Sequence, residues 1–334
     1  MLYWIKFQKK LELLMHEFEI INKYFSKLTN KSKGSLNLND DIFFDKANKI
    51  AVSVDTYIEG KHFINFKNPE LVIKKVIRSS ISDLICKGVK PKYYFVSGSG
   101  NSKAFTKSNL AKISKSLKEE QKKYNIILGG GDTVYSDKLS FTITSIGFSN
   151  KIIYRNRSKV NDDIYVTGNL GDSFLGLLVL KNKTKINKKL CRYFINQYYK
   201  PEIKYSLINH LNKFATSSID LSDGLISDLE KLTNNQNNSY QLFFDKIPVS
   251  NNLKSVINSK NLRKKNLISR GDDYQVLFTA NNRHRSFIKK ISSLKKIKIT
   301  RIGKILNGKL KSSIIDGKGH QIKINNKGYF HAFG

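Results

Sequence analysis

Residues 50–63 read I-A-V-S-V-D-T-Y-I-E-G-K-H-F, and the prediction of the fold starts from them. A run of β-branched residues ends in Asp55 and Thr56, and a glycine and a histidine follow within one short loop. This pattern indicates a buried strand that carries a carboxylate to the edge of a sheet. Open α/β sheets usually hold their ligands at that edge. The stretch therefore predicts an α/β protein with a ligand site near Asp55.

The same combination of strand boundary and carboxylate recurs along the chain. It stands at residues 38–41 (LNDD), 128–133 (LGGGDT), 219–224 (IDLSDG) and 270–274 (RGDDY). Each motif alone is also typical of an ordinary turn or a helix cap. Several together, in a chain of net charge +34, need a common explanation. Divalent cations that hold a polyphosphate provide one, because Mg²⁺ prefers oxygen ligands.

Length and composition indicate a globular protein of two domains. The chain has 334 residues, of which 40% are hydrophobic, so two separate cores can form. The first α/β unit closes near residue 150, which predicts domains at 15–149 and 150–334. Residues 1–14 mix apolar residues with lysines, and their apolar run is too short for a secretory signal. We expect residues 1–14 to be an extension, with Met15 as an alternative start.

Hydropathy and cysteine usage favour a cytoplasmic location. No apolar stretch is long enough for a transmembrane helix, so no membrane partner is expected. Cys86 and Cys191 stand far apart and outside any CxxC motif. This spacing argues against a disulfide framework and a zinc site, and it fits a reducing compartment.

The positive charge is spread along the whole chain. Lys and Arg number 60 against 26 Asp and Glu, a balance that ordinarily suggests a polyanionic partner. The lysines occur in nearly every segment and form no single basic cluster, so nucleic acid is not expected as a partner. A basic nucleic-acid-binding protein without enzymatic activity is the alternative from another class, and it predicts salt-dependent association.

Hydrophobic periodicity and boundary residues predict the elements of the first domain. Asn68 as N-cap, Pro69 in the first turn and Gly88 as a stop enclose a helix of about five turns. The three glycines after Leu128 let backbone amides approach an anion, and they are also typical of a plain turn. The predicted elements are helices at 17–28, 69–87 and 108–124, a loop at 29–39, and strands at 126–128 and 139–143.

The second domain contains two predicted junctions of strand, turn and helix. Residues 164–167 lead through 168–173 (GNLGDS) into a helix whose N-terminus is able to accept phosphate. A second strand ends at Asp220, and a helix begins shortly after Ser222 and Asp223. Ser222 or Asp223 fits the N-cap of this helix. A capping role for Ser222 or Asp223 does not explain why Asp220 stands at the end of a strand. We therefore favour a role in ligand binding for Asp220.

In order and spacing, these motifs resemble the thiamine-monophosphate kinase family of the aminoimidazole-ribonucleotide synthetase ATP-binding superfamily. The resemblance spans residues 17–333 and rests on SVDT at 53–56, HF at 62–63, SDL at 82–84, GGDT at 130–133, VTG at 166–168, DLSDGL at 220–225 and GDDY at 271–274. It implies a two-domain, aminoimidazole-ribonucleotide synthetase-like fold of the α/β (α+β) class. The N-terminal sheet domain would bind ATP and Mg²⁺ and form a homodimer, and the C-terminal α/β domain would complete the active site.

The resemblance also implies roles for individual residues. The catalytic set, acting through the metal ions that it positions, would be Asp55, Asp83, Asp132 and Asp220. The metal ligands would be Asp41, Ser53, Val54, Asp55, Asp83, Asp132, Asp220 and Asp223. ATP would contact Gly131, Asp132, Arg155 and Ser222, and thiamine monophosphate would contact His62, Asp272 and Tyr329.

The chain departs from the family pattern at three places that bear on these roles. Residues 37–39 (NLN) stand where a glycine-rich turn is usual. Val54 replaces a common threonine, so only its backbone carbonyl remains as a metal ligand. Asp272 replaces a usual glutamate, which shortens the side chain that reaches the substrate.

The activity implied by the resemblance is ATP-dependent phosphorylation of thiamine monophosphate to thiamine diphosphate, the final step of thiamine diphosphate biosynthesis. Two polyanions must meet, so charge neutralisation and alignment dominate the barrier. The acceptor phosphate is largely deprotonated at neutral pH, and we therefore expect direct in-line transfer with several Mg²⁺ ions and no strong general base. The alternative within the superfamily is another ATP-dependent synthase of the purine-biosynthetic type.

Overall fold

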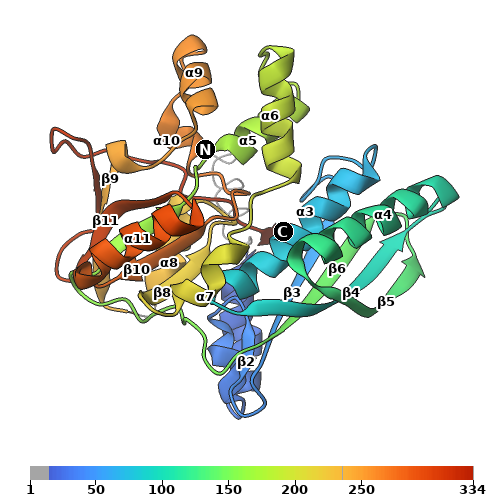
Figure 1. The fold of residues 1–334 in the computed structure, drawn as a ribbon, viewed down its shortest axis with the longest axis horizontal. Helices are drawn as coiled ribbons and strands as arrows, with labels where there is room; N and C mark the ends of the chain where they lie inside the picture. Colours follow the sequence, from blue (N-terminus) through green and yellow to red (C-terminus); the bar gives the residue numbers. More distant parts are fainter. Residues whose placement is uncertain (1–14, 235, 334) are drawn as a thin grey trace, which may run out of the picture.

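The computed structural model describes residues 15–234 and 236–333. They form two main β-sheets with helices packed on them, and helix α3 (Pro69–Cys86) contacts strands of both sheets (Figure 1). The predicted α/β class is confirmed. The prediction that residues 1–14 are an extension lies outside the described residues.

The first sheet has five strands in the order β2-β3-β6-β4-β5. Their bounds are β2 (Phe43–Asp45), β3 (Ile50–Ile58), β4 (Lys90–Gly100), β5 (Ile127–Tyr135) and β6 (Ser140–Phe148). Neighbouring strands are antiparallel except for the parallel pair of β4 and β5. Helix α3 packs on one face, and α4 (Lys107–Tyr124) packs on α3. The opposite face exposes large apolar side chains, among them Val54, Tyr93, Phe95 and Phe148.

Helix α3 has the boundaries that the sequence predicts. Pro69 is its first residue, and the helix ends before Gly88, which has a positive φ of 72°. The side chain of Asn68 makes no capping hydrogen bond. The apolar positions of the predicted helical stripe are all fully buried, namely Val72, Val76, Ile77, Ile81 and Leu84. These side chains lie in hydrophobic clusters with residues of the first sheet, and α3 also contacts a strand of the second sheet.

A strand begins at Ile127, close to the predicted start, but the prediction that it ends at Leu128 was wrong, because the following glycines form no turn. Strand β5 continues through these glycines to Tyr135. A Cβ atom at Gly131 would lie 1.8 Å from the carbonyl oxygen of Val96 on β4. The glycine is required because β4 and β5 approach so closely, next to the bulge between Tyr94 and Phe95.

The second sheet has six strands in the order β12-β9-β11-β7-β10-β8. Their bounds are β7 (Asp163–Thr167), β8 (Ala215–Asp220), β9 (Asn238–Phe243), β10 (Val276–Ala280), β11 (Ile299–Asn307) and β12 (Ser313–Ile315). The helices of this half are α5 (Asp172–Leu180), α6 (Lys188–Tyr199), α7 (Ile208–Leu211), α8 (Leu225–Thr233), α9 (Asn251–Ser259), α10 (Lys264–Leu267) and α11 (Arg285–Lys295). Edge strand β8 contacts α3, where Lys87 donates to the carbonyl oxygen of Ser218 at 2.6 Å.

Residues 17–28 do not form the single amphipathic helix that their spacing predicts. A short α2 (Glu17–Ile20) passes into a π-helical turn (Ile21–Phe25) and a 3₁₀ turn (Ser26–Thr29), and none of the three has a buried residue. Helices in proteins are stabilised mainly by packing of their apolar face, and this stripe has no such packing here. Strand β1 (Met15–His16) pairs with β13 (Ala332–Phe333), which joins both ends of the described chain.

No helix in the described ranges has both the length and the apolar character needed to cross a membrane.

Candidate active site

Three carboxylates from distant parts of the chain meet where the two sheets adjoin. Asp41 precedes β2, Asp83 lies in the last turn of α3, and Asp220 ends β8. One oxygen of each lies within 4.8 Å of the others. Like charges this close repel one another unless a proton or a cation compensates them. The three residues therefore form a candidate cation site.

Asp55, on β3, extends this cluster. Burial, followed by the charges of Asp55 and Asp220, raises the pKa of Asp83 well above its usual value. Burial also raises the pKa of Asp55 to about 6 and that of Asp220 to about 7. The Oδ2 atoms of Asp55 and Asp220 are buried without a hydrogen-bond partner among the described residues. Since buried polar atoms normally have partners, these oxygens fit a hard divalent cation.

Ser53 and Val54 lie beside this cluster on opposite faces of β3. The Ser53 hydroxyl donates to Oδ2 of Asp83 at 3.0 Å and is buried. The Val54 side chain points to the open face of the sheet and is 62% exposed. A valine side chain has no metal-binding atom, so the predicted metal role of Val54 would fall to its backbone carbonyl.

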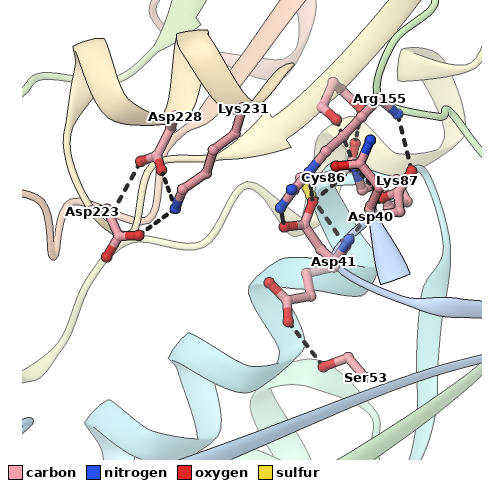
Figure 2. Close-up of polar contacts among 12 residues, drawn as sticks. Asp40, Asp41, Ser53, Cys86, Lys87, Arg155, Asp223, Asp228 and Lys231 are labelled. Carbon is pink, nitrogen blue, oxygen red and sulfur yellow. Dashed lines mark hydrogen bonds and ion pairs between the residues drawn. The ribbon is translucent and has the colours of Figure 1, made fainter. Parts of the chain in front are cut away.

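Two cations compensate the first aspartate pair, and sequence reasoning missed one of them. Lys87 is fully buried, and its Nζ lies 2.7 Å from Asp40 and 2.8 Å from Asp41. The Arg155 guanidinium binds the carboxylate of Asp41 (Figure 2). Lys87 follows the end of α3 directly, but nothing in the sequence distinguishes it from the many other lysines.

Asp223 lies in a separate group (Figure 2). Its carboxylate binds Lys231, which also contacts Asp228 at 3.1 Å. Asp228 accepts hydrogen bonds from the backbone amides of Asp223 and Gly224, both at 3.0 Å. The proposed N-cap role of Ser222 or Asp223 was wrong, because Asp228 satisfies the start of α8 from within the helix.

The three residues predicted to contact the substrate lie together. The rings of His62 and His331 have centroids 5.4 Å apart, and His331 meets Tyr329 edge-on at 5.0 Å. The charge of Asp272 affects the pKa values of both His62 and Tyr329. Burial lowers the pKa of His62, and His331 lowers it further. His331, which the sequence analysis did not select, connects the two predicted rings.

The loop that carries Asp272 has an unusual backbone. Gly271, Asp272 and Tyr274 have φ values of 77°, 62° and 49°. A Cβ atom at Gly271 would lie 2.1 Å from the carbonyl oxygen of Ser222. The Asp272 amide donates to that same oxygen at 2.8 Å. Strained backbone of this kind is concentrated at functional sites, and here it packs the loop against the turn of Ser222.

The glycine-rich junction before α5 is occupied by a side chain of this protein. Asp273 accepts hydrogen bonds from the amide of Gly171 at 3.0 and 2.9 Å. The Asp273 carboxylate thus lies at the N-terminus of α5, where the sequence predicts that a phosphate could bind.

Gly131 and Asp132 do not reach the carboxylate cluster within one chain. Strand β5 is separated from β3 by β6 and β4, a distance of about 14 Å across the sheet. The strand register aligns Asp132 with Ser97, Thr142 and Thr56, whereas Asp55 belongs to the neighbouring row. Paired side chains share a face and successive ones alternate, so Asp132 and Asp55 lie on opposite faces.

Comparison with known proteins identifies the family. Residues 39–149 match the family described as AIR synthase related protein, N-terminal domain. Thiamine-monophosphate kinase of Buchnera aphidicola subsp. Schizaphis graminum (strain Sg) is 34% identical over 329 residues, which cover 95% of this chain and 98% of that relative. This chain belongs to the thiamine-monophosphate kinase family.

Further matches agree with membership of the thiamine-monophosphate kinase family. The enzyme of Buchnera aphidicola subsp. Acyrthosiphon pisum (strain APS) is 34% identical over 325 residues, covering 94% of this chain and 98% of the relative. A solved structure described as AaThiL complexed with AMPPCP and TMP is similar with a TM-score of 0.81 and 25% identity, covering 95% of this chain and 97% of that one. The predicted family and the two-sheet fold are confirmed.

Proposed function

We propose that this family member phosphorylates thiamine monophosphate with ATP to give thiamine diphosphate, the final step of thiamine diphosphate biosynthesis. The observation that carries the proposal is the convergence of Asp41, Asp83 and Asp220, with Asp55 next to Asp83. Two carboxylate oxygens of this group are buried and have no hydrogen-bond partner among the described residues. The solved relative that contains AMPPCP, an ATP analogue, together with TMP supports both substrates.

The oxygen donors of the cluster fit Mg²⁺. Asp41, Asp55, Asp83 and Asp220 would hold it, with Ser53 and the Val54 carbonyl as further ligands. Asp223, which lies in a separate group with Lys231, would serve another ion. Mg²⁺ keeps part of its water shell and takes carboxylates and phosphates as ligands. When bound, it supplies neutralisation of the charge on the transferred phosphoryl group.

The residues of the chain would align the two phosphates. Arg155, which donates to Asp41 beside the cluster, would hold a nucleotide phosphate. The Ser222 hydroxyl would also contact ATP. His62, Asp272 and Tyr329 would hold the acceptor. A phosphate monoester is an adequate nucleophile without a strong base, which agrees with a site rich in Asp, and transfer would be direct and in line.

We propose that two copies of the chain form one functional homodimer through the first sheet. All nine residues of β5 are exposed, including Ile127, Leu128, Val134 and Tyr135. On its outer edge β5 has no partner strand among the described residues. A long edge strand that exposes apolar side chains is an aggregation hazard that proteins normally cover. Within one chain, Gly131 and Asp132 lie too far from the carboxylate cluster to contact it. In such a dimer, Gly131 and Asp132 of the partner subunit would reach it.

The group of aromatic rings near Asp272 favours the kinase over its alternatives. The rings of His62, His331 and Tyr329 lie together and suit a substrate with aromatic rings, which favours the kinase over a purine-biosynthetic synthase. A basic nucleic-acid-binding protein without enzymatic activity is not expected to combine such a group of rings with a cluster of buried carboxylates. We place the enzyme in the cytoplasm, because its two cysteines are free, as is usual in a reducing compartment.

A product assay tests the proposal. Incubation with Mg·ATP and thiamine monophosphate should yield thiamine diphosphate, and Asp220→Asn should lower kcat at least about 100-fold because a charged ligand is lost. Asp316→Asn, in the loop after β12, is the matched control and should keep full activity. Near wild-type turnover of both Asp55→Asn and Asp220→Asn would remove the proposed site.

A further inference from the structure

Lys75 is a buried cation next to the proposed substrate site that none of the roles above uses. It lies on α3 and is 1% exposed. Asp83 follows it by eight positions on the same helix, which is about two helical turns. A buried ammonium group is costly unless it is paired, so its partners indicate what the position is for.

The partners of Lys75 belong to the substrate side of the site. Its Nζ donates to Oδ1 of Asp272 at 2.7 Å and to the backbone oxygen of Tyr198 at 3.4 Å. It also lies 3.8 Å from the centroid of the Tyr198 ring, within cation–π distance. Burial lowers the pKa of Lys75, and the negative charge of Asp272 opposes that shift. The contact with Asp272 thus favours the charged form.

These contacts orient the Asp272 carboxylate. Tyr274 donates its hydroxyl to the same Oδ1 atom at 3.3 Å. In the described part of the chain, the hydrogen bonds and the ion pair of this carboxylate all involve Oδ1. The side chain of Asp272 is 27% exposed, and its backbone is fixed by the bond to Ser222. Oδ2 is consequently left to accept a hydrogen bond from a ligand.

We propose that Lys75 is a positioning residue, which with Tyr274 holds Asp272 so that Oδ2 accepts a hydrogen bond from the amino group of the aminopyrimidine of thiamine monophosphate. This amino group is the N–H donor of that substrate, since the thiazolium ring and the phosphate monoester dianion have none. A site built around a fixed acceptor strongly rejects an analogue that lacks the donor. The inference deepens the proposed function and rests on it.

Substrate discrimination tests the role of Lys75. The probes are thiamine monophosphate and the analogue whose pyrimidine carries oxygen in place of the amino group, both assayed with saturating Mg·ATP. Wild type should prefer the natural substrate in kcat/KM. In Lys75→Met, KM for thiamine monophosphate should rise and the preference should fall, each at least about tenfold, while KM for ATP stays unchanged.

Matched variants separate positioning from general stability. Lys74→Met is the control, because Lys74 is the neighbour on the same helix and pairs with Glu119 at 2.6 Å away from this pocket. It should keep the wild-type preference. Tyr274→Phe removes one hydrogen bond to Oδ1 of Asp272 without changing the charge, so it should also lower the preference for thiamine monophosphate over the analogue. If Lys75→Met does not fold, this variant tests whether Asp272 must be held in position.

An unchanged preference in the folded variants would overturn the role of Lys75 while leaving the kinase activity intact. Absence of thiamine diphosphate formation by wild type would instead remove the proposed function, and the inference with it.

Discussion

At the scale of single residues, charge compensation dominates the candidate site. Asp40 and Asp41 share the buried Lys87, and Asp41 also binds Arg155. Asp55 and Asp220 each keep a buried oxygen without a partner among the described residues. The first pair is therefore neutralised by the protein itself, whereas the second pair depends on protons or a cation.

Removal of Lys87 should destabilise the protein. Lys87→Met leaves Asp40 and Asp41 with Arg155 alone, and breaking a buried ion pair by removing one partner costs about 3 kcal/mol or more. We expect the free energy of unfolding, measured by urea titration in EDTA, to fall by about that amount. Lys112→Met, on the exposed side of α4, should change it by less than about 0.5 kcal/mol. Equal stability of the two variants would contradict a structural role of Lys87.

The stability of the metal-free protein should decrease as pH rises. The folded-state pKa values of Asp55 and Asp220, about 6 and about 7, lie above the usual value of 3.8. The folded state therefore binds more protons than the unfolded state between pH of about 4 and 7, and stability that is present below this range is lost across it. Thermal unfolding in EDTA should show a lower Tm at pH 8 than at pH 5.5.

Mg²⁺ and a substitution provide the controls for this pH dependence. Mg²⁺ should raise Tm more at pH 8, because a ligand that binds only the folded state stabilises it and the carboxylates are then ionised. Asp220→Asn should reduce both the decrease in Tm and the effect of Mg²⁺. A Tm that responds to Mg²⁺ equally in wild type and Asp220→Asn would argue against this site.

At the scale of elements, close backbone packing explains the motifs rich in glycine. Gly131 is needed where β5 meets β4, and Gly271 is needed where its loop meets the turn of Ser222. Neither glycine forms an anion-binding turn within the described chain. Helix α3 also positions residues of the site. Lys75 and Asp83 lie on it and Lys87 follows its last residue, so the buried packing of the helix holds all three in place.

Gly131→Ala should disrupt the pairing of β4 and β5. Its Cβ atom would overlap the carbonyl oxygen of Val96, and strain of this kind typically costs about 1–3 kcal/mol. We expect a matching loss of stability in chemical denaturation. Gly98→Ala is the control on β4, because its Cβ atom would make ordinary contacts at 3.4 Å or more. If Gly131→Ala is as stable as the wild type, β4 and β5 must be able to move apart at this position without a measurable cost.

At the scale of the whole molecule, the site draws on both sheets. Asp55 and Asp83 come from the first unit, Asp220 ends an edge strand of the second, and α3 contacts both. The open face of the first sheet and the exposed strand β5 extend away from this junction (Figure 1). One chain thus presents the carboxylate cluster together with the exposed surface that we propose for the dimer.

Disruption of that surface should give an inactive monomer. Val134→Lys places a charge on β5, where Val134 is 51% exposed in the single chain. If this strand lies in a dimer interface, burial of the charge opposes association, and sedimentation at micromolar concentration should show the monomer mass with at least about tenfold lower kcat. Leu294→Lys, at a 64% exposed position of α11, should remain dimeric and active. A fully active monomeric wild type would exclude the dimer.

The sequence by itself determined the class of fold, the position of α3 and the presence of carboxylates at strand boundaries. These features are local, because periodicity, helix boundaries and strand ends are set by neighbouring residues. The order of the motifs was also sufficient to predict the family, which the comparisons confirm.

Only the tertiary structure decided which of these groups meet. Burial of Lys75 and Lys87 depends on contacts with segments more than a hundred residues away in the chain, at Asp272 and Ser218, and no local pattern marks two lysines among so many. Strand register, not motif content, placed Asp132 on the face opposite Asp55. A pairing of strands is a long-range property, and a shift of one residue reverses the face of every side chain.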